Sequence, residues 1–254
     1  GSRGGLAGQG CAAVRGRGFW GGRRSSRGFE GTGNWGAVRV IERLTGRAFQ
    51  PEYVVYIIIA VNCLVFLLWQ NVRLRRFMHE HFTLSLKGVV VDYRFHTLLT
   101  HFWSHNSQGH LLANMITLWF FGTECVALLG VQRFVQLYLA AGIFSGFCQI
   151  AWPSIASALP IPAKYRMWAY DRNLGASGAI NAVVAYNILT FPSRIILVWF
   201  VLPVPSAFLG SLFLAKDLHG LYSGRSDIGN AAHLGGTFVG LAAWMALRRR
   251  SAWY

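Results

Sequence analysis

The chain has 254 residues, of which 54% are hydrophobic and 13% are charged, whereas soluble domains carry roughly 25% charged residues. This deficit and a mean hydropathy of +0.38 indicate a membrane protein rather than a soluble globular domain. The formal net charge is +15, but the basic residues lie mostly outside the apolar runs, where they suit anionic lipid. No basic stripe interleaved with aromatic residues supports nucleic-acid binding.

Residues 1–50 differ in composition from the rest of the chain. The stretch up to Arg27 has six arginines, many glycines and no acidic residue before Glu30. We expect residues 1–50 to form a disordered basic tail. The alternative is the remnant of an organelle-targeting peptide, since transit peptides are Arg-rich and poor in acids.

From residue 51 onward, long apolar runs alternate with short polar breaks, and a membrane-spanning helix needs about 20 residues. We predict an all-α polytopic membrane protein, with a six-transmembrane-helix core over residues 51–250. The expected spans are Tyr53–Trp69, Gly109–Leu128, Phe134–Trp152, Leu174–Phe191, Ile195–Ala215 and Asn230–Leu247. Pro203 and Pro205 are expected to kink the fifth span, and Arg248 is expected to end the sixth.

Four polar side chains lie near the starts of the second, fourth and sixth spans: His110, Asn114, Ser177 and His233. In an up-and-down bundle these three helices run in the same direction, so their first turns meet at one face of the membrane. Polar side chains inside a membrane are costly and are usually functional. We therefore expect the four to converge.

Their chemistry fits nucleophilic catalysis. A serine hydroxyl needs a base to take its proton, and His233 is the one histidine within the predicted fourth to sixth spans. His110 and Asn114 share a helix face, so they can donate hydrogen bonds to an oxyanion. Because no acidic residue lies near the starts of these spans, we predict a Ser-His dyad rather than a triad. Asp217 and His219 are expected to be solvated loop residues.

Glycines surround these positions. Gly175 and Gly178 flank the serine with little bulk, and Gly236 is followed four residues later by Gly240. This small-xxx-small spacing predicts close packing of the sixth span against another helix. Packing against the fourth span would bring His233 toward Ser177.

Three motifs carry a family resemblance: Gly-Ala-Ser-Gly at 175–178, Ala-His-Leu-Gly-Gly at 232–236, and His105-x4-His110-x3-Asn114. Together they resemble the signatures of the rhomboid intramembrane serine proteases, and residues 105–115 look most like the mitochondrial branch. The resemblance implies that Ser177 is the nucleophile and His233 the general base. It implies an oxyanion hole formed by His110 and Asn114. Structural support is expected from Gly178, Gly236, Gly240 and Glu124, the last matching a family glutamate that braces the first loop.

The resemblance also implies partners and a location. Transmembrane protein substrates and membrane lipid are the expected partners, with no nucleic acid. We expect the mitochondrial inner membrane, with a plastid membrane as the alternative. Neither a cofactor nor a metal is expected, because His101, His105 and His110 lack an HExxH motif and a neighbouring carboxylate.

Two positions depart from the family pattern. His96-Thr97 stands where many members have Trp-Arg, and Asn181 stands where many bacterial members place a tyrosine that stacks on the base. Two other functions are alternatives. A non-catalytic rhomboid-like protein would bind and retain or deliver membrane helices, but such proteins typically lose the serine or the histidine. A small transporter or channel would need a repeat or a charged ring, which the sequence lacks.

Overall fold

The computed structural model describes residues 49–159, 171–198, 201–223 and 229–251, so nearly all of the predicted tail lies outside the described residues. Within these ranges the chain is mostly helical. The elements are α2 (Tyr53–Gln70), η1 (Val72–Leu74), α3 (Arg75–His81), α4 (Leu86–Val90), α5 (Thr97–Thr100), η2 (His101–Trp103), α6 (Gln108–Ser157), α7 (Ser177–Thr190), β1 (Ile195–Val198), β2 (Leu202–Pro205), α8 (Ser206–Ser223) and α9 (Asn230–Ser251).

Helix α6 is two helices joined at one glycine. Its 50 residues would extend about 75 Å as a straight helix, more than twice the thickness of a bilayer's hydrocarbon core. Gly130 breaks it with φ 76° and ψ 162°, a backbone conformation that glycine adopts at little cost. The parts 108–129 and 131–157 correspond to the predicted second and third spans, without the polar break that was expected between them.

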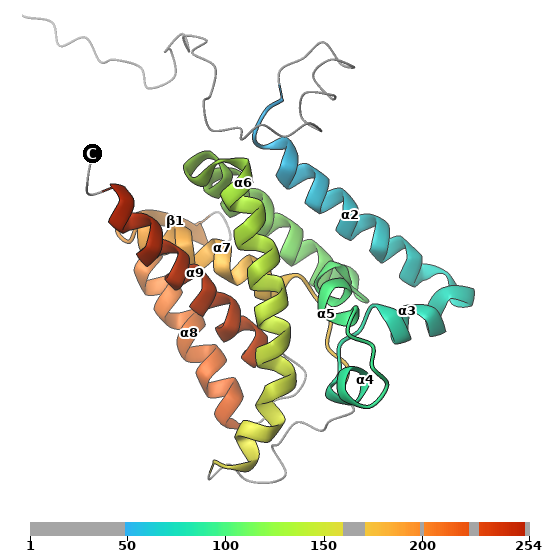
Figure 1. The fold of residues 1–254 in the computed structure, drawn as a ribbon. Helices are drawn as coiled ribbons and strands as arrows, with labels where there is room; N and C mark the ends of the chain where they lie inside the picture. Colours follow the sequence, from blue (N-terminus) through green and yellow to red (C-terminus); the bar gives the residue numbers. More distant parts are fainter. Residues whose placement is uncertain (1–48, 160–170, 199–200, 224–228, 252–254) are drawn as a thin grey trace, which may run out of the picture. The chain divides into compact units, whose positions relative to one another are not determined.

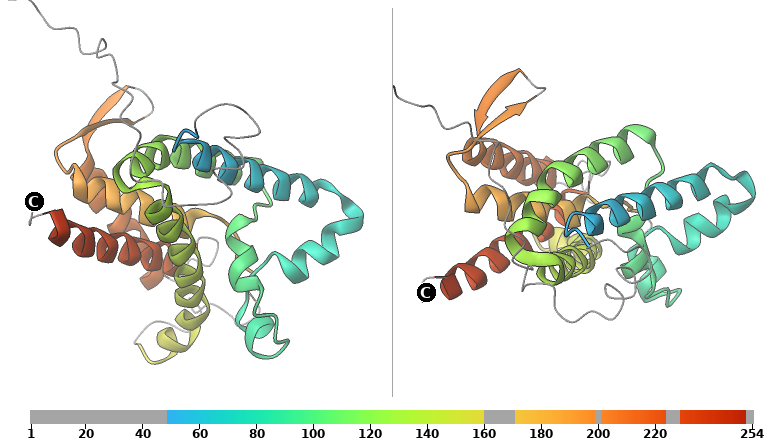
Figure 2. Two further views of the ribbon diagram at one scale, coloured as in Figure 1. Left: turned by 45° about the horizontal axis from the view of Figure 1, so that its top comes forward. Right: turned by 90° about the horizontal axis from the view of Figure 1, so that it is seen from above.

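The long helical segments pack around α6, which lies between α2 on one side and α7, α8 and α9 on the other (Figure 1). Helix α6 contacts α2, α7 and α9, and α9 in turn contacts α7 and α8. Figure 2 shows the same arrangement from two further directions, with the chain turning back after α2 through the short helices α3 to α5 toward the start of α6. Sequence-distant starts of α6, α7 and α9 are thereby brought into one cluster.

The distribution of polar and apolar side chains on the helices is the reverse of that in a soluble protein. Large apolar side chains point outward from most long helices, among them Leu64, Leu67, Leu112, Trp119, Phe147 and Phe208. Polar side chains lie buried between the helices, among them Asn62, His105, Asn114, Gln149, Asn187 and Asp217. Soluble monomers rarely expose so much contiguous apolar surface. In the described part of the chain, Tyr53–Gln70 and Gln108–Ser157 are long and apolar enough to cross a membrane.

The predicted fifth span is wrong over its first half. Ile195–Val198 and Leu202–Pro205 form two antiparallel strands in which Ile195 pairs with Pro205 and Leu197 pairs with Pro203. Proline lacks the N–H group and clashes inside a helix, whereas each strand of a two-stranded ribbon is an edge that tolerates it. Helix α8 therefore begins only at Ser206 and continues well past Ala215 to Ser223.

Smaller corrections concern the ends of other helices. Helix α7 begins at Ser177 rather than at Leu174, so the nucleophile candidate is the first residue of its helix. Helix α9 runs to Ser251 instead of ending at Leu247. The guanidinium of Arg248 lies 4.9 Å from the centre of the Trp244 ring, which allows an arginine to stay within the helix.

Helices α7 and α9 approach so closely that two glycines have no room for a side chain. A Cβ atom at Gly236 would overlap the carbonyl oxygen of Gly178, and one at Gly240 would overlap that of Ala182. This is the packing that the spacing of the two glycines predicts. It fixes the first turn of α9 beside the first turn of α7.

Gly236→Ala is expected to lower the free energy of unfolding by about 1–3 kcal/mol, the usual cost of overpacking, although alanine is the better helix former by about 1 kcal/mol. The measurement is the thermal midpoint in detergent, followed by tryptophan fluorescence. Gly109→Ala is the control, because a Cβ there meets nothing within 4 Å. Equal midpoints for the two variants would contradict the packing.

Candidate active site

Ser177 and His233 are in direct contact. The Oγ atom of Ser177 lies 2.8 Å from Nε2 of His233, which is hydrogen-bonding distance for a hydroxyl that donates to an imidazole nitrogen. Ser177 is the first residue of α7 and His233 lies in the first turn of α9. The close packing of these two helices is what lets both side chains meet.

A polar cavity of about 610 Å³ surrounds this contact. The four side chains that the sequence suggested for a site, His110, Asn114, Ser177 and His233, all line it. The cavity also reaches residues in the connections before α6, α7 and α9, namely Asn106, Ser107, Arg172, Asn173 and Gly229. The starts of three parallel helices therefore form one concave, hydrophilic site.

The loop before Ser177 is shaped to receive His110. Gly175 has φ +130°, and a Cβ atom there would lie 2.6 Å from Cε1 of His110. A side chain at this position would meet both backbone strain and the imidazole ring. The ring of His105 packs edge-on against the other side, with ring centroids 4.9 Å apart, so His110 is held beside the loop that leads to the serine.

His105 connects the start of α6 to the start of α7. Its Nε2 atom lies 3.1 Å from Nδ2 of Asn114 and accepts the backbone N–H of Ala176 at 3.4 Å. Burial lowers the pKa of His105 to about 3, so the ring is neutral. With its proton on Nδ1, Nε2 accepts from both donors, and the second amide hydrogen of Asn114 is left for the cavity.

Gln149, in the second part of α6, joins the start of α9 to the connection before α7. Its Oε1 atom accepts the backbone N–H of Ala232 at 3.0 Å, and its Nε2 atom donates to Oδ1 of Asn173 at 3.1 Å. The sequence motifs did not point to this residue. A buried glutamine within an apolar run was the available signal, because such side chains are costly in a membrane unless they have partners.

Asp217 corrects an expectation. The sequence placed it in a solvated loop with no acidic residue near the site, but it lies inside α8 and is 5% exposed. Its Oδ1 atom accepts a hydrogen bond from Nδ1 of His233 at 3.1 Å. The error follows from the helix boundary, because a span ending at Ala215 excludes Asp217, whereas a helix that runs from Ser206 to Ser223 includes it. His219 also lies in α8 and is exposed.

Comparison with known proteins identifies the family. Residues 92–250 match the family described as Rhomboid domain. The chain belongs to the rhomboid family.

Its relatives include several proteins with mitochondrial names. RHOMBOID-like protein 12, mitochondrial, of Arabidopsis thaliana is 34% identical over 195 residues, covering 76% of this chain and 57% of that protein. Presenilin-associated rhomboid-like protein, mitochondrial, of Homo sapiens is 34% identical over 187 residues, covering 72% and 45%. Rhomboid protein 1, mitochondrial, of Saccharomyces cerevisiae is 32% identical over 195 residues, covering 75% and 52%. The chain spans about half the length of these curated relatives.

Glu124 takes a different part in this rhomboid from the one that the resemblance implied. Its carboxylate forms an ion pair with Arg194, in the turn that follows α7, rather than bracing the first loop. Glu124 lies late in the first part of α6, which runs parallel to α7. The two helices therefore end at the same level, far from residues 71–107.

Of the two departures from the family pattern, His96-Thr97 has local hydrogen-bonding partners and Asn181 lines a cavity. His96 lies 2.9 Å from His81 through Nε2 and Nδ1, and the hydroxyl of Thr97 donates to the carbonyl of Arg94 at 2.7 Å. These contacts hold the first loop of this rhomboid where many members use Trp-Arg. Asn181 lines a second cavity, together with Asp217.

Acid should destabilise the protein through its buried histidines. Burial lowers the pKa of His105 to about 3 and that of His101 to about 4, from 6.5. As pH falls below about 6.5, the unfolded chain takes up protons that the folded chain excludes, so stability falls until the folded-state pKa is reached. The thermal midpoint in detergent is expected to drop from about pH 6.5 toward pH 4.

His105→Gln should flatten this decline, because glutamine keeps an acceptor but does not titrate. The control, His219→Gln, replaces an exposed histidine and is expected to keep the parent's decline. If His105→Gln follows the same pH curve as the parent, the buried neutral state of His105 is wrong.

Proposed function

We propose that this rhomboid is an intramembrane serine endopeptidase that cleaves transmembrane segments of membrane proteins. The observation that carries the proposal is the 2.8 Å contact between Ser177 Oγ and His233 Nε2 within the polar cavity. A serine that donates to an imidazole is the arrangement that activates a hydroxyl for attack on a carbonyl. Membrane protein substrates follow from membership of the family.

The reaction begins when the scissile carbonyl reaches Ser177. The hydroxyl proton passes to Nε2 of His233 as Oγ bonds to the carbonyl carbon, and His233 then gives that proton to the leaving amine nitrogen. An acyl-enzyme remains on Ser177. Water from the polar cavity hydrolyses it, with His233 acting as base a second time.

The negative charge that develops on the carbonyl oxygen needs fixed donors. Asn114 has an amide hydrogen for this task, and His110 lies on the same face of α6, one turn earlier. The first backbone N–H groups of α7 have no carbonyl partner within the helix, so they can add to the oxyanion hole. Such preorganised donors are worth most where water is excluded.

Within the described part of the chain, the six long helical segments are the scaffold that we propose to span the membrane. The outward apolar side chains of α2 and α6 face lipid in this arrangement, and the cavity opens where α6, α7 and α9 begin. A mitochondrial inner-membrane location is part of the proposal. It is supported by the Arg-rich, acid-poor composition of residues 1–27 and by the names of the relatives.

Ser177→Ala is expected to abolish cleavage of a transmembrane reporter in liposomes, because alanine has no nucleophile. Product masses measured by mass spectrometry provide the readout. The control is Ser157→Ala, which removes an exposed serine whose Oγ donates to its own helix at the carbonyl of Ser154. A Ser177→Ala protein that cleaves like the parent would refute the assignment. If the parent itself does not cleave and resists a fluorophosphonate probe, a non-catalytic helix-binding protein is the better description.

Asn114→Ala is expected to lower kcat by about 10²–10³-fold, the effect of removing one oxyanion donor, with KM nearly unchanged. Initial rates over a range of reporter concentrations measure both constants. Thermal midpoints show whether loss of the contact with His105 disturbs the fold. Asn71→Ala, at an exposed position after α2, should keep the parent's kcat. An unchanged kcat in Asn114→Ala would remove this residue from the oxyanion hole.

A further inference from the structure

The imidazole of His233 is held at both of its nitrogens by different helices. Nε2 faces Ser177 of α7 at 2.8 Å, while Nδ1 faces Oδ1 of Asp217 of α8 at 3.1 Å. A carboxylate can only accept, so the proton of the neutral ring sits on Nδ1. Nε2 is thereby left unprotonated, in the tautomer that can take the serine proton.

Asp217 is turned inward by a specific contact between α8 and α9. Most side chains of α8 are exposed, and the buried residues of this helix are Ser206, Asp217 and Gly220. A Cβ atom at Gly220 would overlap the side chain of Asn230. Two contacts one turn apart, Asp217–His233 and Gly220–Asn230, thus join the antiparallel helices α8 and α9. Gly220 permits the close approach that lets the carboxylate of Asp217 reach His233.

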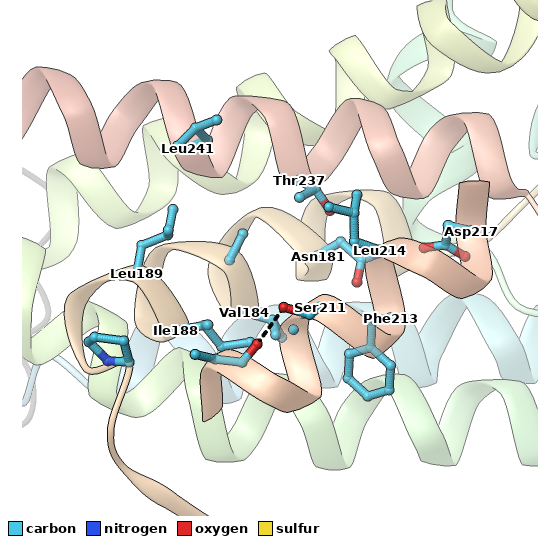
Figure 3. Close-up of a pocket in the computed structure, with 14 residues that line it drawn as sticks. Asn181, Val184, Ile188, Leu189, Ser211, Phe213, Leu214, Asp217, Thr237 and Leu241 are labelled. Atoms are coloured by element: carbon cyan, nitrogen blue, oxygen red, sulfur yellow. Dashed lines mark hydrogen bonds between the residues drawn. The ribbon is translucent and has the colours of Figure 1, made fainter. Parts of the chain in front are cut away.

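The carboxylate also lies at the polar end of a second cavity, of about 330 Å³, between α7, α8 and α9. Asp217, Asn181 and Thr237 lie toward one end of it, and Ile188, Leu189 and Leu241 toward the other (Figure 3). A carboxylate within such largely apolar surroundings is costly. The hydrogen bond to His233 offsets that cost, which links the carboxylate to the base rather than to solvent.

We propose that Asp217 is a positioning residue for His233, so that the site works as a Ser-His-Asp relay; this rests on the proposed function. During attack, the Oγ proton moves to Nε2 as the Oγ–carbon bond forms. The resulting imidazolium keeps its Nδ1–H on Asp217, which stays ionised. The Nε2 proton then passes to the leaving nitrogen as the carbon–nitrogen bond breaks.

Lys216 is the other partner of this carboxylate. Its Nζ atom lies 3.2 Å from the same Oδ1 atom, and its side chain is 53% exposed. This ammonium is partly solvated and offsets part of the negative charge of Asp217. A variant of Lys216 therefore separates loss of this ion pair from loss of the contact with His233.

The test compares Asp217→Asn, Asp217→Glu and Lys216→Met in liposomes, with kcat and KM measured separately. Asp217→Asn is expected to lower kcat by about 10²–10⁴-fold with KM unchanged, because a carboxamide can donate to Nδ1 and favour the wrong tautomer. Asp217→Glu should recover part of the loss. Lys216→Met should stay within about threefold of the parent, since the half-exposed lysine is partly solvated and its ion pair contributes little.

Asp217→Ala with added formate supplies a readout that a purely structural carboxylate would not move. Formate should raise the rate of Asp217→Ala, but not that of Ser177→Ala or His233→Ala. If Asp217→Asn has a lowered thermal midpoint, the formate experiment distinguishes loss of positioning from loss of stability. Full kcat in Asp217→Asn, with Ser177→Ala inactive, would overturn the relay and leave the protease proposal intact. Cleavage by Ser177→Ala would instead overturn the protease proposal itself.

Discussion

The close approach of α7 and α9 is the constraint on which the site depends. In the proposed membrane-spanning bundle, lipid supplies no hydrophobic driving force between helices, so association relies on packing and hydrogen bonds. Gly178, Gly236 and Gly240 remove the side chains that would separate the two backbones. Once these helices touch, their first turns lie together, and Ser177 comes within 2.8 Å of His233. A larger residue at the crossing would move His233 away from Ser177 without altering either side chain.

Around this crossing, neutral polar side chains hold the starts of the helices in place. His105 receives hydrogen bonds from α6 and from the residue before Ser177, and Gln149 bridges the start of α9 and Asn173. Hydrogen bonds between neutral groups avoid the large desolvation cost of buried charges. They also fix the shape of the cavity, which the proposed stabilisation of an oxyanion requires. The same helices therefore carry polar side chains on their buried faces and apolar side chains on their exposed faces.

Helix α8 shows how one local rule reaches the site. The prolines of β2 disfavour a helix, so Leu202–Pro205 pairs with Ile195–Val198 as an antiparallel strand and α8 begins only at Ser206. This start places Asp217 inside the helix, where Gly220 allows contact with α9. An acidic residue in an apolar helix was a visible signal of function. It was missed because the helix was placed too early in the sequence.

The sequence by itself determined the mostly helical architecture, the approximate bounds of the long helices other than the predicted fifth one, and the family. These features depend on local hydrophobicity and on short motifs, which can be recognised without a structure. It also suggested His110, Asn114, Ser177 and His233 as a site, because the starts of parallel helices must share a face. Only the tertiary structure decided the contact between Asp217 and His233, the bridge made by Gln149 and the pairing of Glu124 with Arg194. Each joins segments far apart in the chain, and each depends on where a helix begins and how it is rotated, which hydrophobicity alone does not specify.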